Sequence, residues 1–230
     1  KNSEFIIDFG FVNNFKSSIE NNKNSIFNLF AKYNLDLNLE NFSKSELFLN
    51  IEKVTNDTFL KVFDTNIDIE NTSLKPSDFN NLKSELKLSL INENHNLESG
   101  IISYENLQKK NNDRYEYILP YYYYSTNLSN DFFGGTLNLF SNGSNNYNNT
   151  NQLKTNITND INFVSKNFIN GLGLDSNFTI DLKNLNSLGK NHSNYKSSPQ
   201  VELMSLFSIN SNLPLQKKDL NYNNYLTPKI

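Results

Sequence analysis

Residues 29–39 read Leu-Phe-Ala-Lys-Tyr-Asn-Leu-Asp-Leu-Asn-Leu and give the clearest indication of the fold class. Every second residue from Leu29 to Leu39 is apolar or aromatic, and from Lys32 onward the residues between them are polar. In a β-strand, successive side chains point to opposite faces, so a repeat of two gives each face its own chemistry. The stretch therefore predicts a long strand with one apolar and one polar face.

The same alternation recurs along the chain. It is found in residues 47–51, 82–90, 115–123, 133–139, 157–163, 172–182 and 201–209, and less cleanly in 5–11. No segment shows the i, i+3, i+4, i+7 spacing of an amphipathic helix. Aromatic residues make up 13% of the chain, which argues against disorder. We expect an all-β protein of roughly a dozen strands, joined by antiparallel hairpins in an up-and-down meander.

Composition excludes several classes of protein. The chain has 230 residues, a net charge of -3 and no Cys. A nucleic-acid-binding protein would show a basic stripe, and a disulfide framework or thiolate metal site would need Cys. No apolar run approaches the roughly 18 residues of a transmembrane helix. The sequence opens at Lys1 without a signal peptide, so we interpret residues 1–230 as one segment of a longer chain, whose N- and C-terminal parts are missing here.

Strand length and connection length favour a transmembrane β-barrel over a soluble sandwich. The runs 29–39 and 172–182 match the 9–11 residues with which a tilted strand crosses a bilayer. From residue 82 onward, expected tight connections (91–96, 127–131, 165–167) alternate with longer ones (109–113, 141–151, 183–198), as they do in outer-membrane barrels. The short connection at 41–44 breaks this alternation. A soluble sandwich with the same two faces stays open as an alternative.

Two groups of residues are candidates for a functional role in such a wall. The polar positions of the two long runs predict a wet lumen lining: Lys32, Asn34, Asp36, Asn38, Asp175, Asn177 and Asp181. The four consecutive tyrosines predict an aromatic girdle at the membrane interface, where amphipathic rings are enriched: Tyr121, Tyr122, Tyr123 and Tyr124. Ordinary strand packing is the alternative for the tyrosines.

The sequence shows no strong motif for catalysis, metal binding or cofactor binding. Asp64, Asp68 and Glu70 lack the spacing of an EF-hand and favour a solvated acidic edge. The two histidines, His95 and His192, have no partners for a catalytic triad. Gly171-Leu172-Gly173 is interpreted as a strand glycine pair, and Gly134-Gly135 as a kink at a strand start. We predict no catalytic residues, no metal site and no cofactor.

Several phrases, in order, resemble the LPS-assembly protein family (LptD). They are Thr55-Asn56-Asp57-Thr58-Phe59-Leu60-Lys61-Val62-Phe63, Leu119-Pro120-Tyr121-Tyr122-Tyr123, Gly134-Gly135-Thr136-Leu137-Asn138-Leu139, Asn170-Gly171-Leu172-Gly173-Leu174, Pro199-Gln200-Val201-Glu202-Leu203, Leu213-Pro214-Leu215 and Leu226-Thr227-Pro228-Lys229. Together they cover most of the chain from about residue 45. Where the family usually carries Arg this chain has Asn or Lys, and the family's Trp is absent. The family's first and last strands, between which its gate lies, and its cysteines have no counterpart here, so no gate or disulfide position is carried over.

The resemblance implies the central part of an outer-membrane barrel that inserts lipopolysaccharide into the outer leaflet. Implied partners are lipopolysaccharide, a lipoprotein plug of the LptE type, outer-membrane lipid, and periplasmic LPS-bridge proteins reached through a missing N-terminal domain. The alternatives are a fragment of a TonB-dependent receptor or porin, and a soluble β-rich surface or adhesion module.

Overall fold

The computed structural model describes residues 2–13, 25–62, 68–69, 72–148, 151–218 and 223–228. Within these residues the protein is almost entirely β-structure, with one short α-helix and one 3-10 helix. The all-β class expected from the alternation is confirmed. No helix in the described ranges has the length and hydropathy to span a membrane.

One large antiparallel sheet dominates the molecule. Its strands are β1 (Ser3–Asn13), β2 (Ser25–Asp36), β3 (Lys44–Val54), β6 (Asn81–Ile91), β7 (His95–Asn106), β8 (Tyr115–Phe132), β9 (Gly135–Asn148), β10 (Gln152–Ser165), β11 (Phe168–Ile169), β12 (Asp175–Lys190) and β13 (Gln200–Asn212). The smaller elements are α1 (Phe59–Val62), η1 (Asn111–Arg114), and the strand pairs β4 (Asp68–Ile69) with β5 (Thr72–Ser73) and β14 (Leu215–Lys218) with β15 (Asn223–Leu226).

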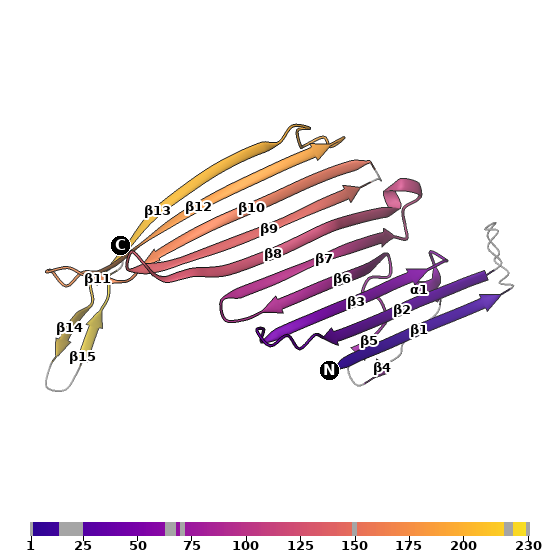
Figure 1. Cartoon of the computed structure of the whole chain (residues 1–230), viewed down its shortest axis with the longest axis horizontal. Coiled ribbons are helices and arrows are strands. Elements are labelled where there is room, and N and C mark those ends of the chain that lie inside the picture. Colours follow the sequence, from indigo (N-terminus) through magenta and orange to yellow (C-terminus); the bar gives the residue numbers. More distant parts are fainter. Residues whose placement is uncertain are drawn as a thin grey trace.

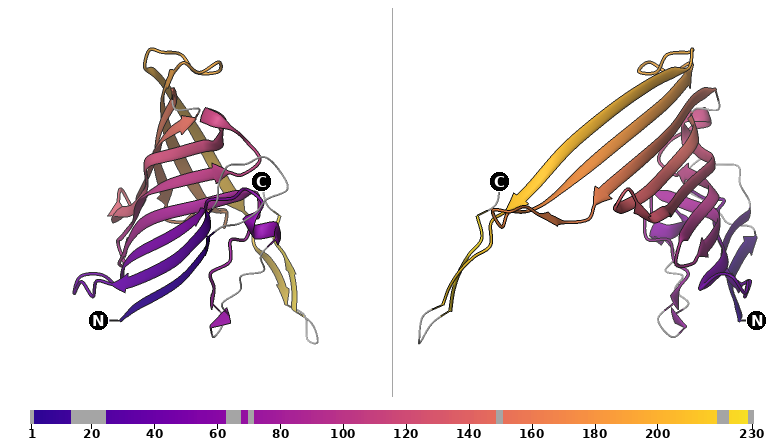
Figure 2. Two further views of the ribbon diagram at one scale, coloured as in Figure 1. Left: turned by 90° about the vertical axis from the view of Figure 1, so that its right-hand side faces the viewer. Right: turned by 60° about the vertical axis from the view of Figure 1, so that its left-hand side comes forward.

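The sheet is an open meander. Its order is β1-β2-β3-β6-β7-β8-β9-β10-β12, and β12 then pairs with both β11 and β13. Each long strand thus lies next to the long strands that precede and follow it in sequence. Figures 1 and 2 show a twisted, curved sheet with β1 and β13 at its opposite ends, so within the described residues it does not close on itself.

The connections lie at two ends of the sheet, which we call rims. The long rim carries residues 55–80, 107–114 and 191–199, and the short rim carries 37–43, 92–94, 133–134 and 166–174. The connection near residue 41 lies on the same rim as 92–94 and 133–134, so it does not break the alternation. The alternation breaks elsewhere: the connection 166–174, expected to be tight, is as long as 191–199, and at the long rim β9 ends at Asn148 and β10 already begins at Gln152. Between β3 and β6, the described residues 55–62, 68–69 and 72–80 form no wall strand, and we call this connection the excursion 55–80.

Three expected connections were also wrong. Strand β8 continues through 127–131, β9 runs to Asn148 through most of 141–151, and β12 runs to Lys190 through half of 183–198. These stretches are rich in Asn and Ser, so they carry no alternation of apolar and polar residues. They are strands because long neighbours supply hydrogen-bonding partners along their whole length.

The ends of the two long runs differ from expectation as well. Strand β2 ends at Asp36, and Asn38 has a φ of 48°, which belongs to a turn. Strand β12 begins only at Asp175, and Gly173 has a φ of 79°, so 171–173 is a turn and not a strand glycine pair. Gly134 likewise sits in the β8–β9 turn with a φ of 70°, and Gly135 starts β9.

Candidate functional site

The strand pairing gives the sheet two chemically distinct faces. Residues directly opposite each other in an antiparallel pair share a face. Starting from Lys32, the pairs lead through Asn50, Glu85, Ile102, Ile118, Asn146 and Lys154 to Gly189 on β12. Gly189 shares its face with Asp181 and Asn177, which lie an even number of residues away. We call this surface the polar face.

The opposite surface carries most of the large apolar side chains of the sheet, and we call it the apolar face. A row of pairs runs from Ser3 through Leu35, Leu47, Leu88, Ser99, Tyr122, Gly143 and Ile157 to Asn186 and Val201. Many large apolar side chains on this face are exposed, such as Phe9 on β1 and Phe207 on β13. Where β8 to β12 meet, they form a hollow of about 330 Å³ without polar lining atoms. No second layer of the described chain covers this face.

Side-chain hydrogen bonds run across the polar face from strand to strand. The Asn127 amide donates to Oδ1 of Asn138 at 3.0 Å, and the Asn138 amide reaches Oδ1 of Asn162 at 3.5 Å. The Asn162 amide then donates to Oδ1 of Asp181 at 2.7 Å. Four strands, β8 to β12, are thus linked by amides that remain partly exposed. Such a surface is suited to contact with water or polar solutes.

The structure brings most of the predicted lumen candidates to one surface. Lys32, Asn34 and Asp36 on β2 share the polar face with Asp175, Asn177 and Asp181 on β12. Asn38 lies beyond β2 in the turn, so it does not belong to this surface by strand alternation. Whether the surface lines a lumen stays a prediction.

The four tyrosines divide between the two faces, two on each. The hydroxyl of Tyr121 donates to Oε1 of Glu85 at 2.9 Å on the polar face, where Tyr123 also lies. Tyr122 and Tyr124 lie on the apolar face, and their hydroxyls contact Ser141 at 3.1 Å and the His95 ring at 2.9 Å. Only Tyr122 and Tyr124 therefore have the orientation that a girdle facing lipid requires.

The excursion 55–80 builds the main buried core, which the sequence reading missed. Ile26, Phe30 and Val54 belong to the polar face by pairing, yet they are buried against Phe59 and Leu60 of α1. Leu74, Leu82 and Leu107 complete the cluster. Three apolar residues at polar-face positions were the signal for a covering segment. The excursion thus caps the long rim: it packs on polar-face positions of β2 and β3 and also against Leu82, which lies on the apolar face of β6.

An ion-pair cluster fastens this excursion to the long rim. Arg114 bridges Asp57 at 2.8 Å and Glu105 at 2.7 Å, and Lys53 reaches the other oxygen of Glu105 at 2.7 Å. Burial raises the pKa of Glu105, but the hydrogen bonds from Lys53 and Arg114 outweigh it, so its pKa lies below the ordinary value. The cluster is a structural clamp, because each charge already has a partner.

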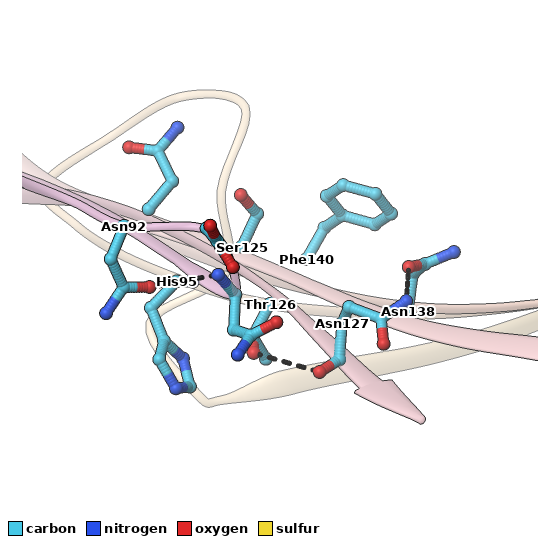
Figure 3. A pocket seen from close by; sticks show the side chains of 10 residues that line it. Asn92, His95, Ser125, Thr126, Asn127, Asn138 and Phe140 are labelled. Carbon is cyan, nitrogen blue, oxygen red and sulfur yellow. Dashed lines mark hydrogen bonds between the residues drawn. The ribbon is translucent and has the colours of Figure 1, made fainter. Parts of the chain in front are cut away.

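A polar hollow of about 200 Å³ lies at the short rim, beside the 92–94 turn (Figure 3). Asn92, Ser125, Asn127, Asn138 and the ring of Phe140 are among its lining residues. The Asn92 side chain accepts the backbone N–H of His95 at 2.7 Å and so holds the turn. The hollow offers amides and hydroxyls together with Glu93 and the ring of His95, whose Nδ1 lies 2.9 Å from the Tyr124 hydroxyl.

The remaining candidates do not assemble into a site. Asp64 and Glu70 lie outside the described residues, as does the side chain of Asp68. In the part of the chain that is described, no three His, Asp or Glu residues gather as metal ligands would. His192 accepts the backbone N–H of Asn194 at 3.2 Å and packs on Tyr195 in the 191–199 connection, far from the 92–94 turn in sequence.

Neither the protein-family models nor the curated proteins contain a match to this chain.

Proposed function

We propose that the chain is part of the wall of an outer-membrane β-barrel, with its apolar face toward lipid and its polar face toward an aqueous lumen. The observation that carries the proposal is the segregation of charge. Charged residues in the long strands lie on the polar face, and the exceptions on the apolar face, Lys53, Glu105 and Lys190, lie at or next to strand ends. A charge on a lipid-facing position costs about 2–4 kcal/mol at the midplane, so lipid excludes it.

Strand length supports the same proposal. The long strands have between 11 residues in β1 and 18 in β8. Strands of soluble proteins average roughly 5–6 residues, whereas a strand that crosses a bilayer needs about 9–11. A soluble adhesion module would instead have to cover the apolar face with a second layer, which the described residues do not provide.

Within this class, we propose lipopolysaccharide assembly as the specific function. One argument for it is that several sequence phrases, in order, resemble those of the LPS-assembly family. A second is that the amide-rich polar face would suit the passage of the saccharide part of the glycolipid. The partners proposed with it are an LptE-type lipoprotein plug in the lumen and periplasmic LPS-bridge proteins. A TonB-dependent receptor or porin is the second candidate, because a two-faced meander of long strands serves all of these barrels equally.

A spin-label scan of β12 tests the wall. Nitroxides are attached singly at Phe178, Ile180 and Leu182, and at Asn177, Thr179 and Asp181, in the full-length protein in membranes. The apolar set should collide with oxygen, which enriches in lipid, and the polar set with a water-soluble nickel chelate. If the apolar set is shielded from both reagents, it packs in a protein core and the wall is wrong.

Depletion in the native host tests the specific function. Surface lipopolysaccharide is measured with an antibody on intact and on lysed cells. The proposal expects the surface fraction to fall while lipopolysaccharide accumulates inside the envelope. Unchanged surface lipopolysaccharide together with a loss of solute uptake would instead establish the receptor or porin alternative.

A further inference from the structure

The apolar face has a polar border toward the short rim, and this border runs obliquely across the strands. It consists of Ser3 on β1, Ser45 on β3, His95 on β7, Ser165 on β10, Ser176 on β12 and Ser211 on β13. Ser176 and Ser211 are directly opposite each other, and their hydroxyls lie 2.9 Å apart. On each of these strands the large apolar residues lie on the side of the border nearer the long rim.

The hydrogen-bonding rows measure how far the border shifts. The row that starts at the border residue Ser3 takes eight steps from strand to strand and reaches Asn186 on β12. The border residue of β12 is Ser176, which lies ten residues from Asn186 toward the short rim. The shift is therefore a little over one residue per strand. With a rise of about 3.3 Å per residue and a strand spacing of about 4.8 Å, it corresponds to an angle of about 40°.

On β1, β3, β7 and β12 the opposite border shifts in the same direction, whereas on β13 Val201 and Leu203 remain apolar at the levels of Asn186 and Asn184. Going toward the long rim, polar or charged residues limit the apolar face at Asn13 on β1, at Lys53 on β3, at Glu105 on β7 and at Asn184 and Asn186 on β12. The apolar residues between the borders are Phe5 to Phe11 on β1 but Phe178 to Leu182 on β12. The apolar surface is thus an oblique belt that crosses the strands instead of following their hydrogen-bonding rows.

We propose that the hydrocarbon of a lipid bilayer occupies this belt, and that the belt marks strands tilted by about 40° from the membrane normal. Strands in closed barrels tilt by roughly 35–45°, so a belt level with the membrane must cross their rows at that angle. The border residues at the short rim are the first, second, second-last or last residues of their strands, so the ends of the strands follow the same slope, as the stagger of a tilted barrel wall requires. The proposal rests on the lipid-facing wall proposed above and adds its position in the bilayer.

Two leucines on the apolar face make the slope testable. Leu49 and Leu188 lie at the same level of the hydrogen-bonding rows. Leu49 pairs with Leu86, and Leu86 pairs with Ile101. Beyond the register shift in β8, the same level passes through Asn145 and Thr155 and reaches Leu188 on β12. The oblique belt contains Leu49 but not Leu188, because on β12 the belt lies nearer the short rim than Leu188 does. A belt along the rows would place both leucines at one depth.

The experiment is quenching of single tryptophans by lipids brominated in the middle of their acyl chains. The chain has no Trp of its own, so Leu49→Trp, Leu188→Trp and Ile180→Trp each report one position in this segment. The full-length protein is reconstituted in bilayers, and the unsubstituted protein supplies the background. We expect strong quenching, at least twofold, at positions 49 and 180, and little at 188. Nitroxides at the same three sites, with oxygen as the collider, provide a second readout if a tryptophan variant does not assemble.

The outcomes separate the slope from the wall. Equal quenching at 49 and 188, with 180 also quenched, would leave a lipid-facing wall but overturn the tilted belt. Absence of quenching at all three positions would overturn the wall itself, because a protein layer or water would then cover the apolar face.

Discussion

Glu105 shows at the scale of a single residue how the excursion 55–80 is fastened to the sheet. Its pKa is lowered against the effect of burial, because Lys53 and Arg114 donate to its two oxygens. A carboxyl with a lowered pKa contributes stability above its unfolded pKa of about 4.3, and the contribution is lost as the pH falls through the folded pKa. The clamp should therefore weaken below about pH 4.

The corresponding prediction concerns Glu105→Gln. We expect the variant to be less stable than the parent at pH 7 and to lose less stability between pH 5 and pH 3. Urea unfolding in detergent, followed by circular dichroism at several pH values, measures both effects. Glu93→Gln in the exposed 92–94 turn is the matched control. An unchanged acid dependence in Glu105→Gln would show that other carboxyls govern it.

The residues of the candidate site were only partly predictable. Alternation alone placed Lys32 and Asp181 on polar positions of their strands, but only the pairing shows that distant strands share a face. Phe30 alternated with Leu29 and so counted as a polar-face position, although it is buried. Its partners Phe59 and Leu60 come from a non-strand segment, and local periodicity contains no information on such a contact.

At the scale of the element, β10 offers a direct test of its two faces. Ile161 is on the apolar face and Thr158 on the polar face of the same strand. We expect Ile161→Lys to lower the free energy of unfolding in bilayers by about 2–4 kcal/mol, because the ammonium group enters hydrocarbon. Thr158→Lys is the matched control and should change it by less than about 1 kcal/mol. Equal effects in urea titrations would contradict the assignment of the faces.

The β8–β9 hairpin depends on a glycine at the start of β9. A Cβ added to Gly135 would lie 2.5 Å from the carbonyl oxygen of Val164 and 2.6 Å from the ring of Phe163. Because backbone cannot move aside easily, we expect Gly135→Ala to destabilise the sheet by about 1–3 kcal/mol. Gly171→Ala, whose Cβ would meet no atom within 4 Å, is the control in the same unfolding experiment. Similar stabilities of the two variants would contradict the close approach.

Elements were predictable where their two faces differ in chemistry. The run 29–39 was predicted to be a strand because apolar or aromatic residues alternate with polar ones, although the strand itself ends at Asp36. Stretches such as 141–148 and 183–190 have polar residues on both faces over much of their length, so only their long neighbours reveal them as strands. The turn at 171–173 imitated a strand because Leu and Gly alternate there, while the positive φ of Gly173 is invisible in the pattern.

At the scale of the whole molecule, the two rims predict a sidedness. Outer-membrane barrels have short periplasmic turns and longer extracellular connections. The rim with 55–80, 107–114 and 191–199 should therefore face the outside of the cell, and the rim with 92–94 and 133–134 the periplasm.

Membrane-impermeant maleimide tests this orientation on intact cells. A cysteine at Ser193 in the 191–199 connection should be labelled, and one at Asn94 in the 92–94 turn only after the outer membrane is permeabilised. The chain has no Cys, so its own residues add no background signal. The reverse pattern would invert the sheet in the membrane.

The meander also has a consequence for how errors in assembly spread. Each long strand after β1 pairs with the long strand that precedes it in sequence, and so takes its alignment mainly from that strand. A slip of one residue in a hairpin exchanges the two faces of the slipped strand. If later strands followed that slip, they would present charges to lipid and leucines to water. The register of the whole wall is thus set locally and early, at connections as short as 92–94 and 133–134. A slip at one of these turns would be passed on to every strand that pairs after it.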